Sequence, residues 1–117
     1  MDVKLLCEAI RDSWGADTSY FTDWHESSPS YGQCAVTALV VQDYLGGNIM
    51  KKKVNGGSHY LNELPDGTLL DPTMSQYLLV MVETSPEIRE RSRLISSNGL
   101  IARYAILSER VRRRLPP

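Results

Sequence analysis

The chain has 117 residues, of which 42% are apolar and 23% charged, and its formal net charge is −1 at pH 7. This size and composition predict a single globular domain over residues 1–117. A near-neutral charge provides no overall basic field for phosphate binding, so a nucleic-acid partner is not expected. No apolar run approaches the roughly 18 residues that a membrane-spanning helix needs, so no membrane partner is expected.

The start of the sequence has neither a basic leader followed by an apolar stretch nor a small-residue cleavage site. This predicts a cytoplasmic location. In a reducing cytoplasm the two cysteines, Cys7 and Cys34, are expected to remain free thiols, and each needs its own explanation. The sequence does not indicate an oligomeric state.

The first predicted element is an amphipathic helix near the N-terminus. Its apolar residues recur at the spacing of one helical face: Val3, Leu6, Cys7, Ile10 and Trp14. Gly15 follows as the predicted helix end. Because Cys7 lies within the apolar stripe, it is predicted to be a buried packing thiol.

Residues 16–31 show no sustained period and are rich in Ser, Asp, Thr and aromatic residues, which predicts a long loop. Loops of this length in compact domains tend to be functional. Its rings either line a cleft or complete the core: Tyr20, Phe21, Trp24 and Tyr31. We retain Trp24 and Tyr31 as candidate substrate-binding residues, and we expect His25 to be a solvated polar residue.

A stretch that is apolar on nearly every side runs from Gly32 to Gln42, and two glycines, Gly46 and Gly47, follow. This pattern predicts a buried central helix with a glycine C-cap. Cys34 then lies in the first helical turn, and Ser30 is the candidate N-cap.

The next segments predict an antiparallel sheet, with strands at residues 48–54, 58–64 and 68–71. A Pro-Asp-Gly turn at residues 65–67 separates the last two strands. Pairing that is symmetric about residue 66 places His59 opposite residue 73, so that Asp71 becomes its near diagonal neighbour on the same face. With the central helix packed on this sheet, the predicted fold class is α+β.

Beyond Pro72, residues 77–82 predict a short apolar strand, whereas the charged segment 86–95 fits either a helix or an irregular excursion. The final segment carries a helical stripe: Leu100, Tyr104, Leu107, Val111 and Leu115. Arginines concentrate in its last turns, where positive charge favours the helix dipole.

Three residues have the types and positions needed for nucleophilic catalysis by cysteine. A cysteine attacks as thiolate, which a helix N-terminus and a nearby imidazolium favour. A histidine supplies the imidazolium and returns a proton, and a carboxylate orients it through the other ring nitrogen. We therefore predict Cys34, His59 and Asp71 as the catalytic set, with the Cys34 backbone N–H and Gln33 as a candidate oxyanion site. Taken singly, each residue also fits a purely structural role.

Thiolate, imidazole and carboxylate are also zinc ligands, so a metal site is the rival chemistry. Because Cys7 and His25 show no ligand pairing, we expect no metal and no cofactor.

Three short motifs surround the predicted catalytic residues: Gly32-Gln33-Cys34, Ser58-His59-Tyr60 and Leu70-Asp71-Pro72-Thr73. They resemble the G-x-C, histidine-strand and D-x-T motifs of the transglutaminase-like and papain-like superfamily of cysteine enzymes. This resemblance implies a core in which the cysteine-bearing helix packs on an antiparallel sheet, together with a Cys-His-Asp triad.

A closer resemblance, from about residue 24 to residue 115, is to small bacterial proteins of the YunG type. It is carried by residues 31–47, residues 57–62 and the pattern Asp71-x-Thr73-x-x-Gln76. Tyr60 and Gln76 lie within these motifs and join the candidate substrate-binding residues. The chain departs from the transglutaminase-like pattern at Leu61, where an aromatic residue is frequent, and from the papain-like pattern in having its glutamine adjacent to the cysteine.

Two functions fit these features. The first is a cysteine-dependent acyl-transfer enzyme that acts on a peptide, protein or small amide by hydrolysis, deamidation or transamidation. The second is a noncatalytic module that keeps the fold and binds a peptide, protein or small ligand, which the shortness of the chain favours.

Overall fold

The computed structural model describes residues 1–54, 56–74, 86–97 and 99–117, so the predicted strand at 77–82 and the candidate Gln76 lie outside the described residues. The described elements are, in order, α1 (Val3–Ser13), α2 (Cys34–Leu45), β1 (Asn48–Val54), β2 (Gly57–Glu63), β3 (Leu69–Leu70), β4 (Glu87–Arg89), α3 (Arg91–Ile95) and α4 (Leu100–Arg114). The α+β class is confirmed. The papain- or transglutaminase-like core stays a prediction.

The strands form one antiparallel sheet in the order β3-β2-β1-β4. β2 and β3 pair Asn62 with Leu70 and Glu63 with Leu69. Continued for three more residues, this register places residue 73 opposite His59. The predicted register about residue 66 is therefore confirmed.

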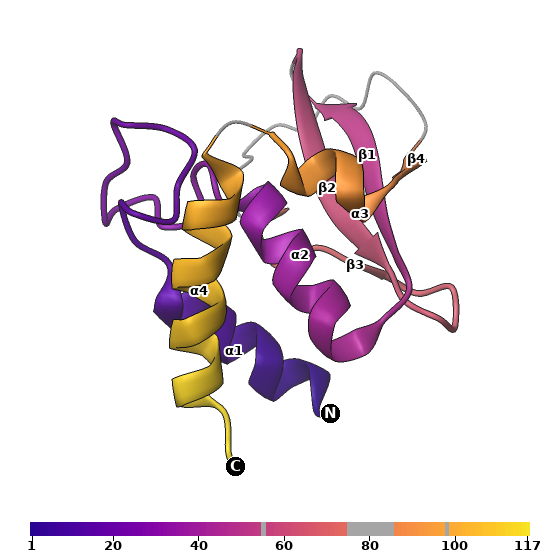
Figure 1. Cartoon of the computed structure of the whole chain (residues 1–117), viewed down its shortest axis with the longest axis horizontal. Coiled ribbons are helices and arrows are strands. Elements are labelled where there is room, and N and C mark those ends of the chain that lie inside the picture. Colours follow the sequence, from indigo (N-terminus) through magenta and orange to yellow (C-terminus); the bar gives the residue numbers. More distant parts are fainter. Residues whose placement is uncertain (55, 75–85, 98) are drawn as a thin grey trace.

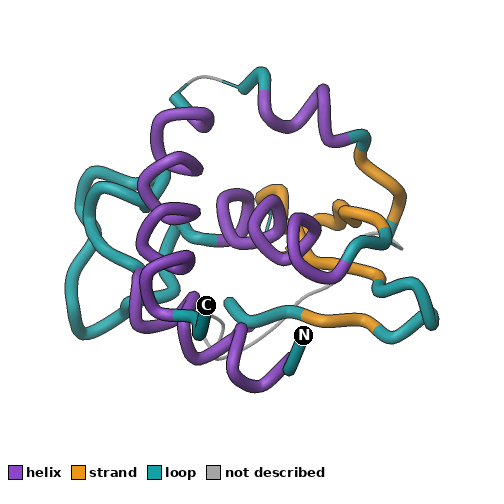
Figure 2. Tube along the Cα trace, turned by 60° about the horizontal axis from the view of Figure 1, so that its bottom comes forward, coloured by secondary structure: helices purple, strands orange, loops and turns teal. Residues whose placement is uncertain are grey.

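The helix α2 lies between the sheet and α4, and α1 packs against α4 (Figures 1 and 2). This central position explains why α2 is apolar on nearly every side: Val36, Ala38, Leu39, Val40 and Val41 are all at most 1% exposed. The helix ends before its C-cap residue Gly46, whose positive φ of 72° glycine adopts without steric strain. The predicted buried helix and its glycine C-cap are confirmed.

The start of α2 differs from the prediction. Its N-cap residue is Gln33, with no side-chain cap hydrogen bond, and the proposed cap Ser30 instead accepts a backbone hydrogen bond from Gln33 N–H through its own carbonyl oxygen. The Ser30 prediction was wrong because the chain makes an additional turn between Ser30 and the helix. This turn leaves Cys34 as the first helical residue.

The terminal helices follow their predicted stripes, except that Val3 is 37% exposed and α1 ends at Ser13, before the predicted Gly15. In α1, the Asp2 side chain caps the N-terminus by accepting from Leu5 N–H, and Cys7 is buried as predicted. The charged segment that fitted two interpretations contains β4 and then the short helix α3. No helix within the described parts of the chain has the length and apolar character needed to cross a membrane.

Candidate functional site

His59 and Asp71 form a short, oriented pair at the sheet. His59 lies in β2 and is fully buried, and its Nε2 is 2.6 Å from Oδ2 of Asp71, which follows β3. The other carboxylate oxygen, Oδ1, accepts from the backbone N–H and the hydroxyl of Thr73. Thr73 thus fixes the carboxylate, and the carboxylate fixes the imidazole ring. These bonds give a physical reason for an aspartate after β3 with a threonine two residues later.

Cys34 completes the cluster from the start of α2. Its side chain is partly exposed and hydrogen-bonds with His59. Because Nε2 of His59 is bonded to Asp71, Nδ1 is the ring nitrogen left to face the thiol. The structure therefore brings together all three residues predicted as the catalytic set.

The surroundings of His59 favour its protonated form. Burial acts to lower the pKa of His59, but its hydrogen bonds with Asp71 and Cys34, and the charges of both groups, outweigh burial and raise the pKa from 6.5 to about 9. The ring is then an imidazolium at pH 7. An imidazolium beside a sulfur atom at a helix N-terminus stabilises the thiolate form of that sulfur.

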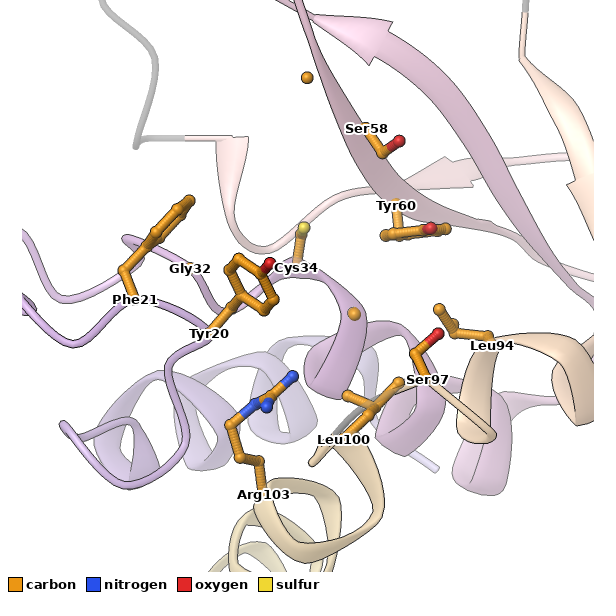
Figure 3. A pocket seen from close by; sticks show the side chains of 12 residues that line it. Tyr20, Phe21, Gly32, Cys34, Ser58, Tyr60, Leu94, Ser97, Leu100 and Arg103 are labelled. Carbon is orange, nitrogen blue, oxygen red and sulfur yellow. The ribbon is translucent and has the colours of Figure 1, made fainter.

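Cys34 opens onto a cavity of about 530 Å³, within the usual range for small-molecule sites. Figure 3 shows the side chains around it, which come from the 16–31 loop, α2, β2, α3 and α4. The lining residues most relevant to chemistry are Tyr20, Phe21, Cys34, Ser58, Tyr60 and Arg103.

Two of the five candidate oxyanion or substrate-binding residues relate directly to this cavity. Tyr60 lines it, and burial is the main cause that raises the pKa of its hydroxyl. Tyr31 supports the wall by stacking on Phe21, with ring centroids 4.4 Å apart and an interplanar angle of 13°.

Two other candidates lie elsewhere. Trp24 donates through Nε1 to the Pro29 carbonyl and supports the loop. The fully buried amide of Gln33 accepts from the Thr18 hydroxyl and donates to the Gly15 carbonyl. The Gln33 side chain is therefore bonded to the segment after α1 and is not brought to the cavity. Gln76, the last candidate, lies outside the described residues.

Sequence reasoning missed Ser58 and Arg103, which both line the cavity. Strand alternation could have indicated Ser58. Residues two apart in a strand share a face, and Ser58 is two residues before the candidate Tyr60. Arg103 lies three positions after Leu100 on α4, which places it beside the buried stripe. Predicting Arg103 as a lining residue would have required knowing that α4 forms one wall of the cavity.

Among the described residues, no three or more His, Cys, Asp or Glu side chains form a group that could hold a metal ion.

The fold and this cluster define a small α+β protein in which a helix-terminal cysteine meets a carboxylate-oriented histidine beside a cavity. The chain belongs to the YunG protein family, whose sequence profile matches residues 2–116. It is 41% identical over 68 residues to the "Uncharacterized protein YunG" of Bacillus subtilis (strain 168). That alignment covers 58% of this chain and 56% of the relative. No solved structure matches the chain.

Proposed function

We propose that this protein is a cysteine-dependent acyl-transfer enzyme in which Cys34 is the nucleophile, His59 the proton carrier and Asp71 the group that orients His59. The observation that carries the proposal is the 2.6 Å contact between His59 Nε2 and Asp71 Oδ2, together with the hydrogen bond of the same ring with Cys34. Nucleophile, base and orienting group within hydrogen-bond reach are the arrangement that activated nucleophiles require.

In the proposed reaction, the Cys34 thiolate attacks the carbonyl carbon of an amide and forms a C–S bond. The His59 imidazolium gives its proton to the departing amine as the C–N bond breaks, which leaves a thioester. Water or a second amine then attacks this thioester while His59 accepts its proton. Breaking the C–S bond releases the acid or the new amide and restores the thiolate and the imidazolium.

The oxyanion formed during the attack needs hydrogen-bond donors. The first N–H groups of α2 have no partner within the helix and carry the positive end of its dipole, so we propose the Cys34 N–H as one donor. Tyr60 replaces Gln33 as the proposed side-chain donor, because its hydroxyl lies at the cavity and stays protonated over the neutral range.

The resemblance to papain-like and transglutaminase-like enzymes supports the same proposal, since the order of helix-borne cysteine, strand histidine and strand-end aspartate is shared. The proposed substrate is a peptide, protein or small amide in the cytoplasm.

The test uses p-nitrophenyl acetate as an activated acyl donor. We expect more than one equivalent of p-nitrophenolate per protein and an acetyl group on the Cys34 peptide by mass spectrometry. Cys34→Ala should abolish both signals, whereas Cys7→Ala should retain them. Turnover that persists in Cys34→Ala would contradict the proposal.

Tyr60→Phe separates oxyanion stabilisation from thiol activation. It should slow acetylation about tenfold or more. It should leave alkylation by iodoacetamide unchanged, because that displacement forms no oxyanion. Equal slowing of both reactions would assign Tyr60 a purely structural role.

A noncatalytic binding module is the second candidate, and the burial of His59 favours it. The ring is 0% exposed and is not among the residues that line the cavity, which restricts proton transfer between the ring and a substrate. This candidate predicts at most one equivalent of p-nitrophenolate, with no release of the acetyl group.

A further inference from the structure

Among the described residues that line the cavity beside Cys34, Arg103 is the only one with a permanent charge. We infer that the cavity binds an acyl donor that carries a free carboxylate and that Arg103 binds this carboxylate. The inference rests on the proposed role of Cys34 and narrows the proposed substrates to small carboxylate-bearing amides.

Tyr20 and Gly99 are neighbours of Arg103 that bear on the position of its guanidinium. Its guanidinium carbon lies 5.5 Å from the centroid of the Tyr20 ring, a cation–π contact between α4 and the 16–31 loop. Figure 3 shows the guanidinium directed from α4 toward Tyr20 and the space below Cys34. Gly99 precedes α4, and a Cβ added there would lie 3.1 Å from an Arg103 terminal nitrogen. The glycine therefore leaves room for the guanidinium at the helix start.

The position of Arg103 is also partly dehydrated. Burial lowers the pKa of Arg103, although the nearby Tyr20 acts in the opposite direction. A guanidinium that has lost part of its hydration gains more from a carboxylate partner than an exposed one does. The fork of parallel N–H donors matches the two oxygens of a carboxylate, which gives orientation as well as affinity.

The remaining walls limit the rest of the ligand. Tyr20, Phe21, Leu94 and Leu100 provide aromatic and aliphatic surface, and Ser58 and Ser97 provide hydroxyls. A volume of about 530 Å³ suits a small molecule with an apolar body. With the acyl carbon at Cys34 and the carboxylate at Arg103, the two polar groups of the ligand meet two different lining residues of the cavity.

Charge-matched alkylating probes test this inference without a known substrate. Iodoacetate is compared with iodoacetamide, iodoacetylglycine with iodoacetylglycinamide, and iodoacetyl-β-alanine with its amide. The measured quantity is the Cys34 labelling rate with the carboxylate probe divided by the rate with its amide. This ratio for the folded protein is then divided by the same ratio for the protein unfolded in urea. Peptide mass spectrometry keeps Cys34 separate from Cys7.

For at least one probe length, we expect the folded protein to favour the carboxylate probe by about fivefold to tenfold, as a partly buried charged contact allows. Arg103→Gln should bring this ratio to 1, Arg103→Lys should keep part of it, and 0.5 M NaCl should reduce it. Arg113→Gln is the matched control, because it removes the same charge from an exposed position of α4 and should change nothing.

A folded-state ratio at or below 1 for all three probe lengths would overturn the inference. So would a preference that is equal in Arg103→Gln and Arg113→Gln. The rate of Cys34 alkylation by iodoacetamide tests the proposed function separately. If this rate is the same without His59, the proposal that His59 activates Cys34 is wrong, whatever the carboxylate-to-amide ratio shows. The two failures are therefore distinguishable.

Discussion

The two cysteines of this chain occupy helices of opposite character. Cys7 lies in the interior of α1 at 7% exposure, whereas Cys34 is the first residue of α2 and opens onto a cavity. Burial raises the pKa of the Cys7 thiol, and the charge of Arg11 offsets this only in part. Cys34 instead has His59 as a hydrogen-bond partner. The same side chain is thus a packing group at one place and a candidate nucleophile at the other.

The difference arises from position within the helix and from the neighbouring residues. A thiol inside an apolar stripe is dehydrated, which disfavours its anion more than a nearby surface charge can offset. A thiol at a helix N-terminus meets unpaired N–H groups and the positive end of the dipole. Four substitutions test this contrast, in decreasing order of expected effect.

Gln33→Glu is expected to have the largest effect because Gln33 joins the two cysteine-bearing regions. Its buried amide donates to the Gly15 carbonyl just after α1, and a carboxylate cannot donate. We expect the free energy of unfolding, measured in urea, to fall by about 3 kcal/mol. Gln42→Glu is the control: Gln42 is half-buried in α2, and its amide donates to the exposed Gly47 carbonyl, which water can satisfy instead, so the cost should be less than about 1 kcal/mol. Equal losses would contradict the joining role of Gln33.

Asp71→Asn should weaken only the Cys34 region, and in a pH-dependent way. The folded-state pKa of His59 is raised from 6.5 to about 9. The stabilisation from its pairing with Asp71 is therefore complete below pH 6.5 and is lost as the pH rises through 9. We expect Asp71→Asn to lower the free energy of unfolding by about 2 kcal/mol at pH 6.

Urea unfolding at pH 6, 7.5 and 9.5 measures this pH dependence, and the difference from the unsubstituted protein should shrink at each step. Asp66→Asn, in the exposed turn, should show no such trend. A difference that grows with pH would contradict the charged pairing.

His59→Gln should slow the alkylation of Cys34 by iodoacetamide at pH 6 by about tenfold. An ordinary thiol is less than about 1% thiolate at this pH, and the lower intrinsic nucleophilicity of an ion-paired thiolate offsets part of the gain. Cys7 should remain unlabelled in both proteins. His25→Gln, at an exposed histidine, is the control, and an equal effect there would remove the contrast between the two thiols.

Cys7→Ser should have the smallest effect. It places a hydroxyl in the buried stripe of α1 and should lower the free energy of unfolding by about 1 kcal/mol. The labelling rate of Cys34 should not change. A tenfold slower labelling of Cys34 would mean that the regions around Cys7 and Cys34 are coupled. Cys7→Ala, which adds no polar group, should cost less than Cys7→Ser.

Local patterns in the sequence predicted much of the fold. The stripes of α1 and α4, the apolar stretch of α2 and the turn centred on Asp66 each depend on neighbouring residues, which sequence displays directly. The register about that turn was enough to bring His59 and Asp71 together, because a hairpin fixes which residues lie opposite one another.

Long-range features of the site could not be predicted. Gln33 precedes the nucleophile in the sequence, yet its amide bonds to Thr18 and Gly15, which no local pattern indicates. Arg103 enters the cavity only because α4 packs beside α2 and the 16–31 loop. Ser30 fits a cap by residue type, but capping depends on where the backbone turns into the helix, which sequence fixes only to within a residue or two.

The contacts between α1 and α4 have a consequence for the newly made chain. Arg110 donates to the Ser13 carbonyl, and Arg114 donates to the Ser13 hydroxyl, across sequence separations of 97 and 101 residues. At a synthesis rate of about 5–20 residues per second, α1 leaves the ribosome roughly 5–20 s before the helix that covers it. During that interval its apolar stripe is open to chaperones, and the last turns of α4 complete the native core.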